Sequence, residues 1–281
     1  MKRKKIAPRI LATFIVLSLV FTSCTQDEND STEAQQQNLE ELRMSSEMDD
    51  METVLEDVVI TAYEDQETAE NRMANAVQAY FSDCVTITAV LQLNHRELTI
   101  DFGTEGCFVN GHLLKGQIVV TYDRDPEAQE VMLNYTLVDF YINLRQLIGT
   151  RTILRELSNE NGNPQFTHTL NLTVIWPNGA QATRDGLKVR EWVEGFGDAD
   201  FTNDVFEITG HWNSTFVNGN THSHEVIIPL RRELTCAHFV SGSIDVERTY
   251  FSGVLDFGEG ACDNQATFTF DGGDVVNITL N

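Results

Sequence analysis

The stretch DFGTEGC at residues 101–107 returns later in the chain as DFGEGAC at residues 256–262, and this repeat decides the fold. Each copy follows an earlier cysteine, Cys84 or Cys236, after two runs of strand-forming residues. We expect the Phe of each copy to end a strand facing inward, and the next Gly to permit a reversal of the backbone. The Asp oxygens then accept N–H groups of the loop. The repeat indicates a duplicated unit or two equivalent edges of one sheet.

The cysteines of the two copies predict two disulfide bonds in an exported chain. Besides Cys24 the sequence holds four, Cys84, Cys107, Cys236 and Cys262, and four cysteines allow three pairings. We favour Cys84–Cys107 and Cys236–Cys262, because each pair closes a loop of similar length inside one copy, worth about 3 kcal/mol by chain entropy. Pairing between the copies, reduced buried cysteines and a four-thiolate zinc site are the alternatives, although the sequence lacks the close Cys-x-x-Cys spacing usual for zinc.

Strand-forming residues dominate from Val85 onward. Along residues 168–176 the side chains of Leu170, Leu172, Val174 and Trp176 share one face, and the polar residues between them share the other. This alternation is typical of antiparallel sheet with one buried face. Turn signals recur at Asn110-Gly111, Asn161-Gly162, Asn178-Gly179, Asn218-Gly219 and Gly272-Gly273. The sequence predicts a mainly β fold over residues 84–281, with antiparallel sheet of roughly twelve strands as a sandwich or an open meander.

Residues 1–23 form a targeting segment that we exclude from the fold. A basic start is followed by an apolar run over residues 10–21, too short for a membrane span of roughly 20 residues and typical of a secretory signal peptide. The small residues Thr22-Ser23 before Cys24 resemble a bacterial lipoprotein signal, in which cleavage precedes the cysteine and its thiol carries lipid. An ordinary secretory signal with an incidental Cys24 is the alternative.

The charge of the chain restricts its partners. Residues 27–70 carry 16 acids and a single base, and residues 71–281 carry 27 acids and 13 bases. Nucleic-acid binding needs clustered Lys and Arg, so a nucleic-acid partner is disfavoured. An acidic surface also disfavours lying flat on anionic lipid. Attachment to the membrane is therefore expected through the lipid at Cys24 alone, and stable anchoring takes more than one acyl chain.

Two segments are expected between the signal peptide and the sheet. Residues 24–50, with many acids and few apolar side chains, predict a solvated, disordered acidic tether. Residues 51–83 predict a short helical lead-in of one or two helices, because apolar residues recur at helical spacing. They are Val54, Leu55, Val58, Val59 and Ala62, followed by Met73, Ala76, Val77, Tyr80 and Phe81.

Several motifs together resemble a family of uncharacterised, surface-exposed outer-membrane lipoproteins of Bacteroidetes. The acidic cluster after Cys24 looks like the surface-export signal of that group, and Asp30-Ser31-Thr32 resembles its short O-glycosylation motif. In the mature chain the resemblance rests on residues 99–103 with Cys107 and Gly111, residues 115–122, residues 190–192 and residues 256–262. It implies a lipid-anchored protein of the outer membrane, facing the cell exterior, with a β-rich fold and no assigned reaction.

Two clusters of residues are candidates for binding a metal ion, and for each we prefer the interpretation that the side chains belong to an ordinary polar surface. Asp198, Asp200 and Asp204 place oxygens at spacings that calcium uses, but the loop does not match an EF-hand, and we favour an acidic surface loop with Asx turns. His222 and His224, two residues apart, predict side chains on the same face of a strand. No third ligand is fixed by the sequence, so we favour an exposed polar strand edge and predict no metal or other cofactor.

No set of residues carries a catalytic signature. The Asp-Phe-Gly motif lacks the Gly-rich and His-Arg-Asp loops of kinases, and Gly-x-Ser-x-Gly is absent. Pairs of carboxylates suited to glycoside hydrolysis arise by chance in a chain with 43 acids. Trp176, Trp192 and Trp212 suit a sugar-binding face, but Trp176 and Trp192 more often belong to a sheet core.

The sequence therefore favours a non-enzymatic binding or structural module on the outer-membrane surface, with a glycan or protein as ligand and no catalytic residue assigned. The alternative is a surface-tethered hydrolase or accessory protein acting on polysaccharide or cell-wall glycan. A deep cleft lined by two close carboxylates and a Trp favours the enzyme, and a flat or convex sheet favours the module.

Overall fold

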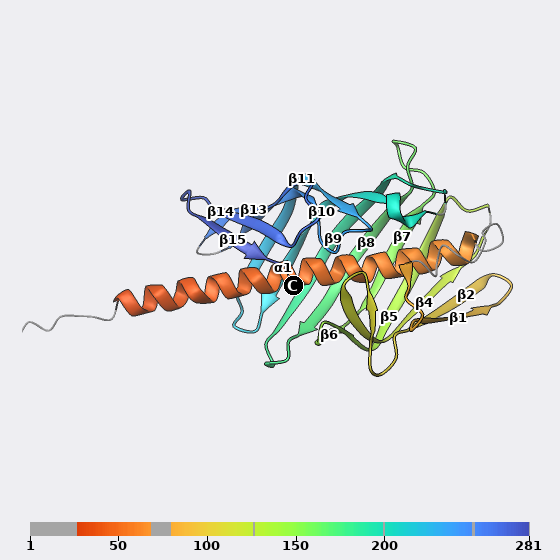
Figure 1. Cartoon of the computed structure of the whole chain (residues 1–281), viewed down its shortest axis with the longest axis horizontal. Coiled ribbons are helices and arrows are strands. Elements are labelled where there is room, and N and C mark those ends of the chain that lie inside the picture. Colours follow the sequence, from red (N-terminus) through yellow and green to blue (C-terminus); the bar gives the residue numbers. More distant parts are fainter. Residues whose placement is uncertain (1–26, 69–79, 126, 199, 249–250, 281) are drawn as a thin grey trace, which may run out of the picture. The chain divides into compact units, whose positions relative to one another are not determined.

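The computed structural model describes residues 27–68, 80–125, 127–198, 200–248 and 251–280. They form a long helix, a single turn of 3-10 helix and one antiparallel sheet of 15 strands (Figure 1). The predicted mainly β fold is confirmed, and its arrangement is an open meander. The chain divides into two units between Leu39 and Glu40, and the whole sheet belongs to the second, together with residues 40–68 of the helix.

The elements follow one another with short connections. Their bounds, in chain order, are α1 (Asp27–Thr68), β1 (Thr86–Leu91), β2 (His95–Asp101), β3 (Cys107–Val109), β4 (His112–Asp123), β5 (Glu130–Ile142), β6 (Arg145–Ile148), β7 (Thr150–Glu156), β8 (Gln165–Ile175), β9 (Gln181–Glu194), η1 (Phe201–Asn203), β10 (Val205–Phe216), β11 (Thr221–Glu233), β12 (Ser241–Glu247), β13 (Ser252–Glu259), β14 (Gln265–Phe270) and β15 (Val275–Thr279).

Neighbouring strands in the sheet are mostly neighbours in the sequence. The order is β1-β2-β4-β5-β6-β8-β9-β10-β11-β12-β13-β14-β15, with β3 paired to β4, and β7 paired to β5 and β8. Tight turns join the strands as the Asn-Gly signals predict. Between β8 and β9, Trp176 N donates to Ala180 O at 2.8 Å and Gly179 N donates to Trp176 O at 2.9 Å.

The two Asp-Phe-Gly copies adopt the same conformation at the ends of β2 and β13. Gly103 N donates to Asp101 Oδ1, and Gly258 N donates to Asp256 Oδ1, each at 2.8 Å. Phe102 and Phe257 are buried, and both glycines have positive φ, 73° and 87°. The disulfide bonds are Cys84–Cys107 and Cys236–Cys262, with Cα–Cα distances of 5.8 and 5.4 Å, so the favoured pairing is confirmed.

The N-terminal prediction is wrong in its main feature. Instead of a disordered tether over residues 24–50 and short helices after it, Asp27–Thr68 is one helix of 42 residues. From residue 41 to residue 64 nearly every side chain is buried, Glu52 and Leu55 completely. Acidic residues were expected to be solvated because the nearby sequence offers them only Arg43, but their partners are bases far along the chain. Residues 69–79 of the predicted lead-in lie outside the described residues.

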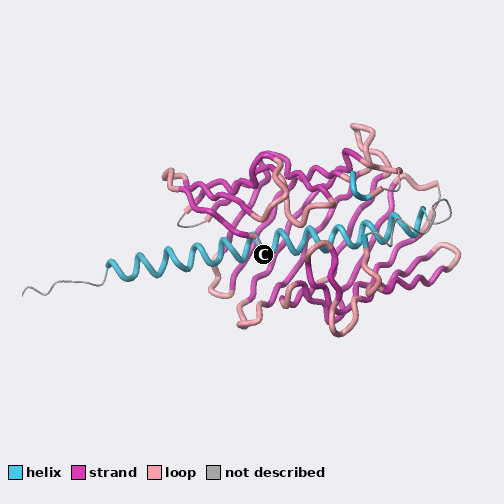
Figure 2. Tube along the Cα trace, in the orientation of Figure 1, coloured by secondary structure: helices cyan, strands magenta, loops and turns pink. Residues whose placement is uncertain are grey.

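Residues 40–68 of α1 are surrounded by the sheet, which curves around them (Figure 2). Side chains on all sides of the helix are buried, apolar and polar alike. Two glycines in the middle of β9 and β10 permit the strands to bend and approach closely. A Cβ on Gly186 would lie 2.4 Å from His211 O, and one on Gly210 would lie 2.2 Å from Leu187 O. We call the side of the sheet that contacts α1 the inner face.

Candidate functional site

The inner face is basic, in a sheet whose chain is otherwise acidic. Twelve Lys and Arg residues are described beyond α1, and nine of them pair with carboxylates of α1. The nine are Arg124, Arg145, Arg151, Arg155, Arg184, Lys188, Arg190, Arg232 and Arg248; the other three are Arg96, Lys115 and Arg231. We call the surface formed by the nine bases the helix-binding face. Most of the positively charged side chains of the sheet therefore pair with a single helix.

Asp49 and Glu52 lie at the centre of this face. Arg184 pairs with both carboxylates, at 3.2 Å from Glu52 Oε2. Lys188 Nζ lies 2.8 Å from Glu52 Oε2 and 3.5 Å from Asp49 Oδ1. Arg151 Nη2 lies 2.9 Å from the other oxygen of Glu52. These five side chains are at most 2% exposed, so the whole cluster is dry.

One turn further along α1, Asp57 links β9 and β11 by pairing with one guanidinium group from each strand. Arg190 of β9 pairs with Asp57 Oδ1, and Arg232 of β11 donates to Asp57 Oδ2 from Nε at 3.0 Å and from Nη2 at 2.6 Å. All three side chains are completely buried. Nearer the end of the helix, Glu64 pairs with Arg155 at 3.0 Å and Glu67 with Arg124 at 2.9 Å.

Glu41 lies at the start of the part of α1 that belongs to the second unit, and it fixes this part of the helix to the β10–β11 hairpin. Its Oε1 accepts from Asn218 Nδ2 at 2.7 Å and from Asn220 Nδ2 at 2.9 Å. Its Oε2 pairs with Arg248 and lies 3.2 Å from His222 Nε2. Although burial opposes it, these hydrogen bonds and Arg248 lower the pKa of Glu41.

Five of the seven histidines face α1 as well. His112 and His238 flank Asp50, His168 lies 3.5 Å from Glu56, and His222 and His224 approach Glu41 and Ser45. Burial, reinforced by neighbouring arginines, lowers the pKa of His168 and His224 well below its ordinary value. It lowers the pKa of His222 to about 4. His168, His222 and His224 are therefore neutral at pH 7 and add no charge to the helix-binding face.

Buried carboxylates of the helix differ in their protonation. Burial opposes the charge on Glu52, but Lys188, Arg184 and Arg151 together hold its pKa well below its ordinary value. Burial raises the pKa of Glu56 to about 7, because Lys188 and Arg190 offset only part of the desolvation. Glu56 Oε1 also has no hydrogen-bond partner among the described atoms. Glu52 is the anionic anchor of the helix, and Glu56 is close to its titration point at neutral pH.

The arrangement fixes the position of the helix more than it adds stability. Removing ions from water costs several kcal/mol per ion, and buried pairs repay this cost only with good geometry. Each base of the sheet meets a carboxylate at its own position along α1. A shift of the helix by one turn would therefore leave buried charges unpaired. The helix-binding face can therefore hold a negatively charged helix in a single register.

His222 and His224 occupy the same side of β11, as their spacing predicts. The exposed-edge interpretation is wrong, since they are 0% and 2% exposed. His224 stacks on Trp212 with ring centroids 5.4 Å apart, and His222 packs against Phe216. Across the described residues, no group of three or more His, Cys, Asp or Glu side chains is placed to hold a metal ion.

The acidic loop after β9 forms the predicted Asx turns. Asp200 N donates to Asp198 Oδ1 at 2.8 Å, and Thr202 N donates to Asp200 Oδ1 at 3.0 Å. Asn203 Nδ2 donates to Asp198 Oδ2 at 2.7 Å. Asp200 thereby caps the 3-10 turn η1, and Asp204 is buried. The carboxylates of this loop are used to hold the backbone.

All three tryptophans belong to the interior, as predicted for Trp176 and Trp192. Trp176 Nε1 donates to Glu47 Oε2 at 2.7 Å, so this ring helps to seat α1. Trp212 lies beneath Lys188, whose Nζ is 4.3 Å from the ring centroid. Arg184 also lies over the Trp212 ring, so the two bases that pair with Asp49 and Glu52 both contact this buried tryptophan.

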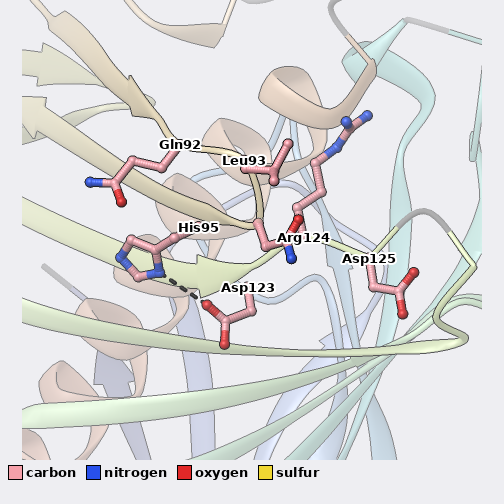
Figure 3. A pocket seen from close by; sticks show the side chains of 7 residues that line it. Gln92, Leu93, His95, Asp123, Arg124 and Asp125 are labelled. Atoms are coloured by element: carbon pink, nitrogen blue, oxygen red, sulfur yellow. Dashed lines mark hydrogen bonds and ion pairs between the residues drawn. The ribbon is translucent and has the colours of Figure 1, made fainter.

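A shallow surface pocket lies at the β1–β2 turn (Figure 3). Its wall includes Leu93, which is 93% exposed, and His95, whose Nδ1 lies 3.0 Å from Asp123 Oδ1. Arg124, also in the wall, pairs with Glu67 of α1. The pocket is an open hollow at the surface, and it meets the helix-binding face only at its edge, through Arg124.

Sequence reasoning missed the bases of the inner face. Arg184, Lys188 and Arg190 do alternate along β9, and this period of two is the signal that could have placed them on one side of the sheet. Charged residues at alternate strand positions usually lie on the solvent-exposed face of a sheet. The pattern on β9 therefore predicts that these side chains point outward, whereas they point inward toward α1. The side of β9 that carries these bases is buried because α1 packs against it.

Comparisons of the chain with protein-family models, with curated proteins and with solved structures find no match. Among the described residues, no helix is both long and apolar enough to cross a membrane.

Proposed function

We propose that the chain is a surface lipoprotein of the outer membrane, anchored by lipid at Cys24, whose sheet acts as a non-enzymatic binding and structural module. Its working surface is the helix-binding face, and its internal ligand is the acidic helix α1. The signal segment and the acidic residues after Cys24 support the location. The pairing of nine of twelve described bases with one helix carries the proposed role of the sheet.

The proposal assigns the inner face a binding role because its chemistry is that of recognition. Charged pairs across an interface give register and specificity more than raw affinity. An acidic helix with few basic residues is complementary to this face over residues 41–67, from Glu41 at Arg248 to Glu67 at Arg124. Glu52 and Asp57, which could otherwise serve as acids or bases, are held as counterions by buried bases.

The location is tested with a Cys24→Ser variant. We expect the variant to leave the membrane fraction and the wild type to remain in it. Protease added to intact cells should digest the wild-type protein, since the sheet is proposed to face the exterior. Retention of Cys24→Ser in membranes, or full protection of the wild type in intact cells, would contradict the proposed anchor or orientation.

The binding role is tested in the same molecule by a double-mutant cycle. Asp57→Asn and Arg232→Gln are measured singly and together for the free energy of unfolding. A coupling of about 1 kcal/mol or more is expected for residues that share a buried network. Additive effects would mean that the helix-binding face does not recognise the helix through these charges.

A further inference from the structure

We propose that the helix-binding face also accepts the acidic helix from a second copy of this chain, so that α1 of one molecule fills the sheet of another. The inference rests on the proposed function, since it uses the same face. It adds a partner, namely another molecule of this protein, and it makes the helix an exchangeable element.

The first support is that the sheet is complete without the helix. Every strand pairs with other strands, and none pairs with α1. Side chains carry the hydrogen bonds that join Glu41, Asp49, Glu52 and Asp57 of α1 to the sheet, and Arg184 Nη2 also donates to the helix backbone at Ser45 O at 3.0 Å. A helix can therefore leave or enter without breaking the backbone hydrogen bonds of the sheet.

The second support is the covalent connection. Residues 69–79 join α1 to the rest of the chain, and the Cys84–Cys107 disulfide and the buried Tyr80 and Phe81 fix the point where the chain meets the sheet. The steps from Thr68 to Tyr80 can span at most roughly 40 Å in an extended chain. That length permits the helix to reach a neighbouring molecule while the sheet keeps its own disulfide bonds.

The third support is charge, which also identifies the partner. Residues 40–67 carry eleven acids against Arg43. The remaining surface of the sheet is acidic too, because nine of its twelve described bases point inward. Two copies therefore repel each other except where an acidic helix meets a helix-binding face. The segment of this chain that fits that face in length, charge and apolar content is α1 itself.

Buried ion pairs also favour exchange over permanent burial. When the helix leaves, Asp57, Arg190 and Arg232 all regain hydration, and this regained hydration offsets much of the lost attraction. An interface built from apolar side chains alone has no such compensation. The contacts made in a second copy are the same contacts, so the exchange needs no new complementarity.

The experiment uses two tagged versions of the full mature chain carrying Cys24→Ser to remove the lipid. Copy A carries Asp57→Arg, which damages its helix and leaves its helix-binding face intact. Copy B carries Arg190→Glu and Arg232→Glu, which damages the face and leaves the helix intact. We expect the mixture to form a 1:1 complex in which the helix of copy B is protected from hydrogen exchange. A copy B that also carries Asp57→Ala is the matched control, because its helix has no charge at this position for either face, and its recovery should be lower by about tenfold or more.

A second measurement covers the case in which a charge variant does not fold alone. Wild-type chains in two isotopic forms are refolded together at high concentration and weighed intact. Mixed dimers that disappear when both chains carry Asp57→Arg support the inference. Monomers at every concentration, together with an unprotected helix of copy B in the first mixture, overturn it. If the double-mutant cycle within one chain still shows coupling, the proposed function survives that failure.

Discussion

At the scale of single residues, Asp57 is the clearest test of the helix-binding face. It compensates two fully buried guanidinium groups, Arg190 and Arg232. Removing one partner of a buried pair costs about 3–5 kcal/mol, because the other charge remains buried without compensation. We therefore expect Asp57→Ala to lower the free energy of unfolding by about that amount in denaturant titration.

A matched control is present on the same helix. Glu40 lies 4.0 Å from Arg43 with both side chains more than half exposed. Exposed pairs of this kind contribute about 0–1 kcal/mol, so Glu40→Ala should change stability little. Equal effects of Asp57→Ala and Glu40→Ala would contradict the burial of Asp57 against the sheet.

Glu56 makes stability depend on pH near neutrality. Its pKa is raised to about 7 in the folded chain by burial, so the folded state holds a proton that the unfolded state has lost above its ordinary pKa of 4.5. Stability from this group is complete at low pH and declines as pH rises through about 7.

Glu56→Gln keeps the shape of the side chain and removes its titration. Above pH 7 the variant should be more stable than the wild type by about 1–3 kcal/mol, and the difference should shrink toward pH 4.5. Unfolding curves of both proteins at several pH values measure this difference. A difference that does not change with pH would refute the assignment.

At the scale of elements, glycine controls how the sheet bends around the helix. Gly210 in β10 has φ of 135°, and an added Cβ would lie 2.2 Å from Leu187 O of β9. Overpacking and backbone strain each cost about 1–3 kcal/mol. Gly210→Ala should therefore lower the melting temperature clearly. Gly179→Ala should lower it less, because an added Cβ at Gly179 has open space around it, although φ there is 83°. A Gly210→Ala protein no less stable than Gly179→Ala would show that the close approach of β9 and β10 is not needed.

Elements with a local signal were predictable. The alternation along β8, the Asn-Gly hairpins and the two Asp-Phe-Gly loops depend on residues that are near in sequence. The sheet of roughly twelve strands is confirmed, and the described residues contain 15. Short strands such as β3 and β6 have three and four residues, too few to show an alternation of their own.

The helix was not predictable in the same way. Residues 24–50 have the composition of a disordered segment, because unpaired carboxylates cannot be buried. Asp49 is buried only because Arg184 and Lys188, more than a hundred residues later, neutralise it. Burial of charge is a property of the pair, and the pairing is visible only in the folded chain. The inward orientation of the bases on β9 was missed for the same reason.

At the scale of the whole molecule, the second unit is a sheet assembled on a charged helix. Its core has apolar residues from α1, among them Met48, Leu55 and Val58, packed against strand residues from Leu98 to Phe216. Charged residues share this interior and hold the helix in register. The two disulfide bonds fasten the loops after β2 and β13 and leave the helix free of covalent links to the sheet.

Hydrogen–deuterium exchange along residues 41–64 of the mature protein at pH 7 tests this account most directly. If the sheet surrounds the helix, these amides should be strongly protected, and Asp57→Ala should speed their exchange before that of the central strands β8 and β9. Exchange of residues 41–64 within seconds in the wild type, as in a solvated acidic tether, would contradict the central claim.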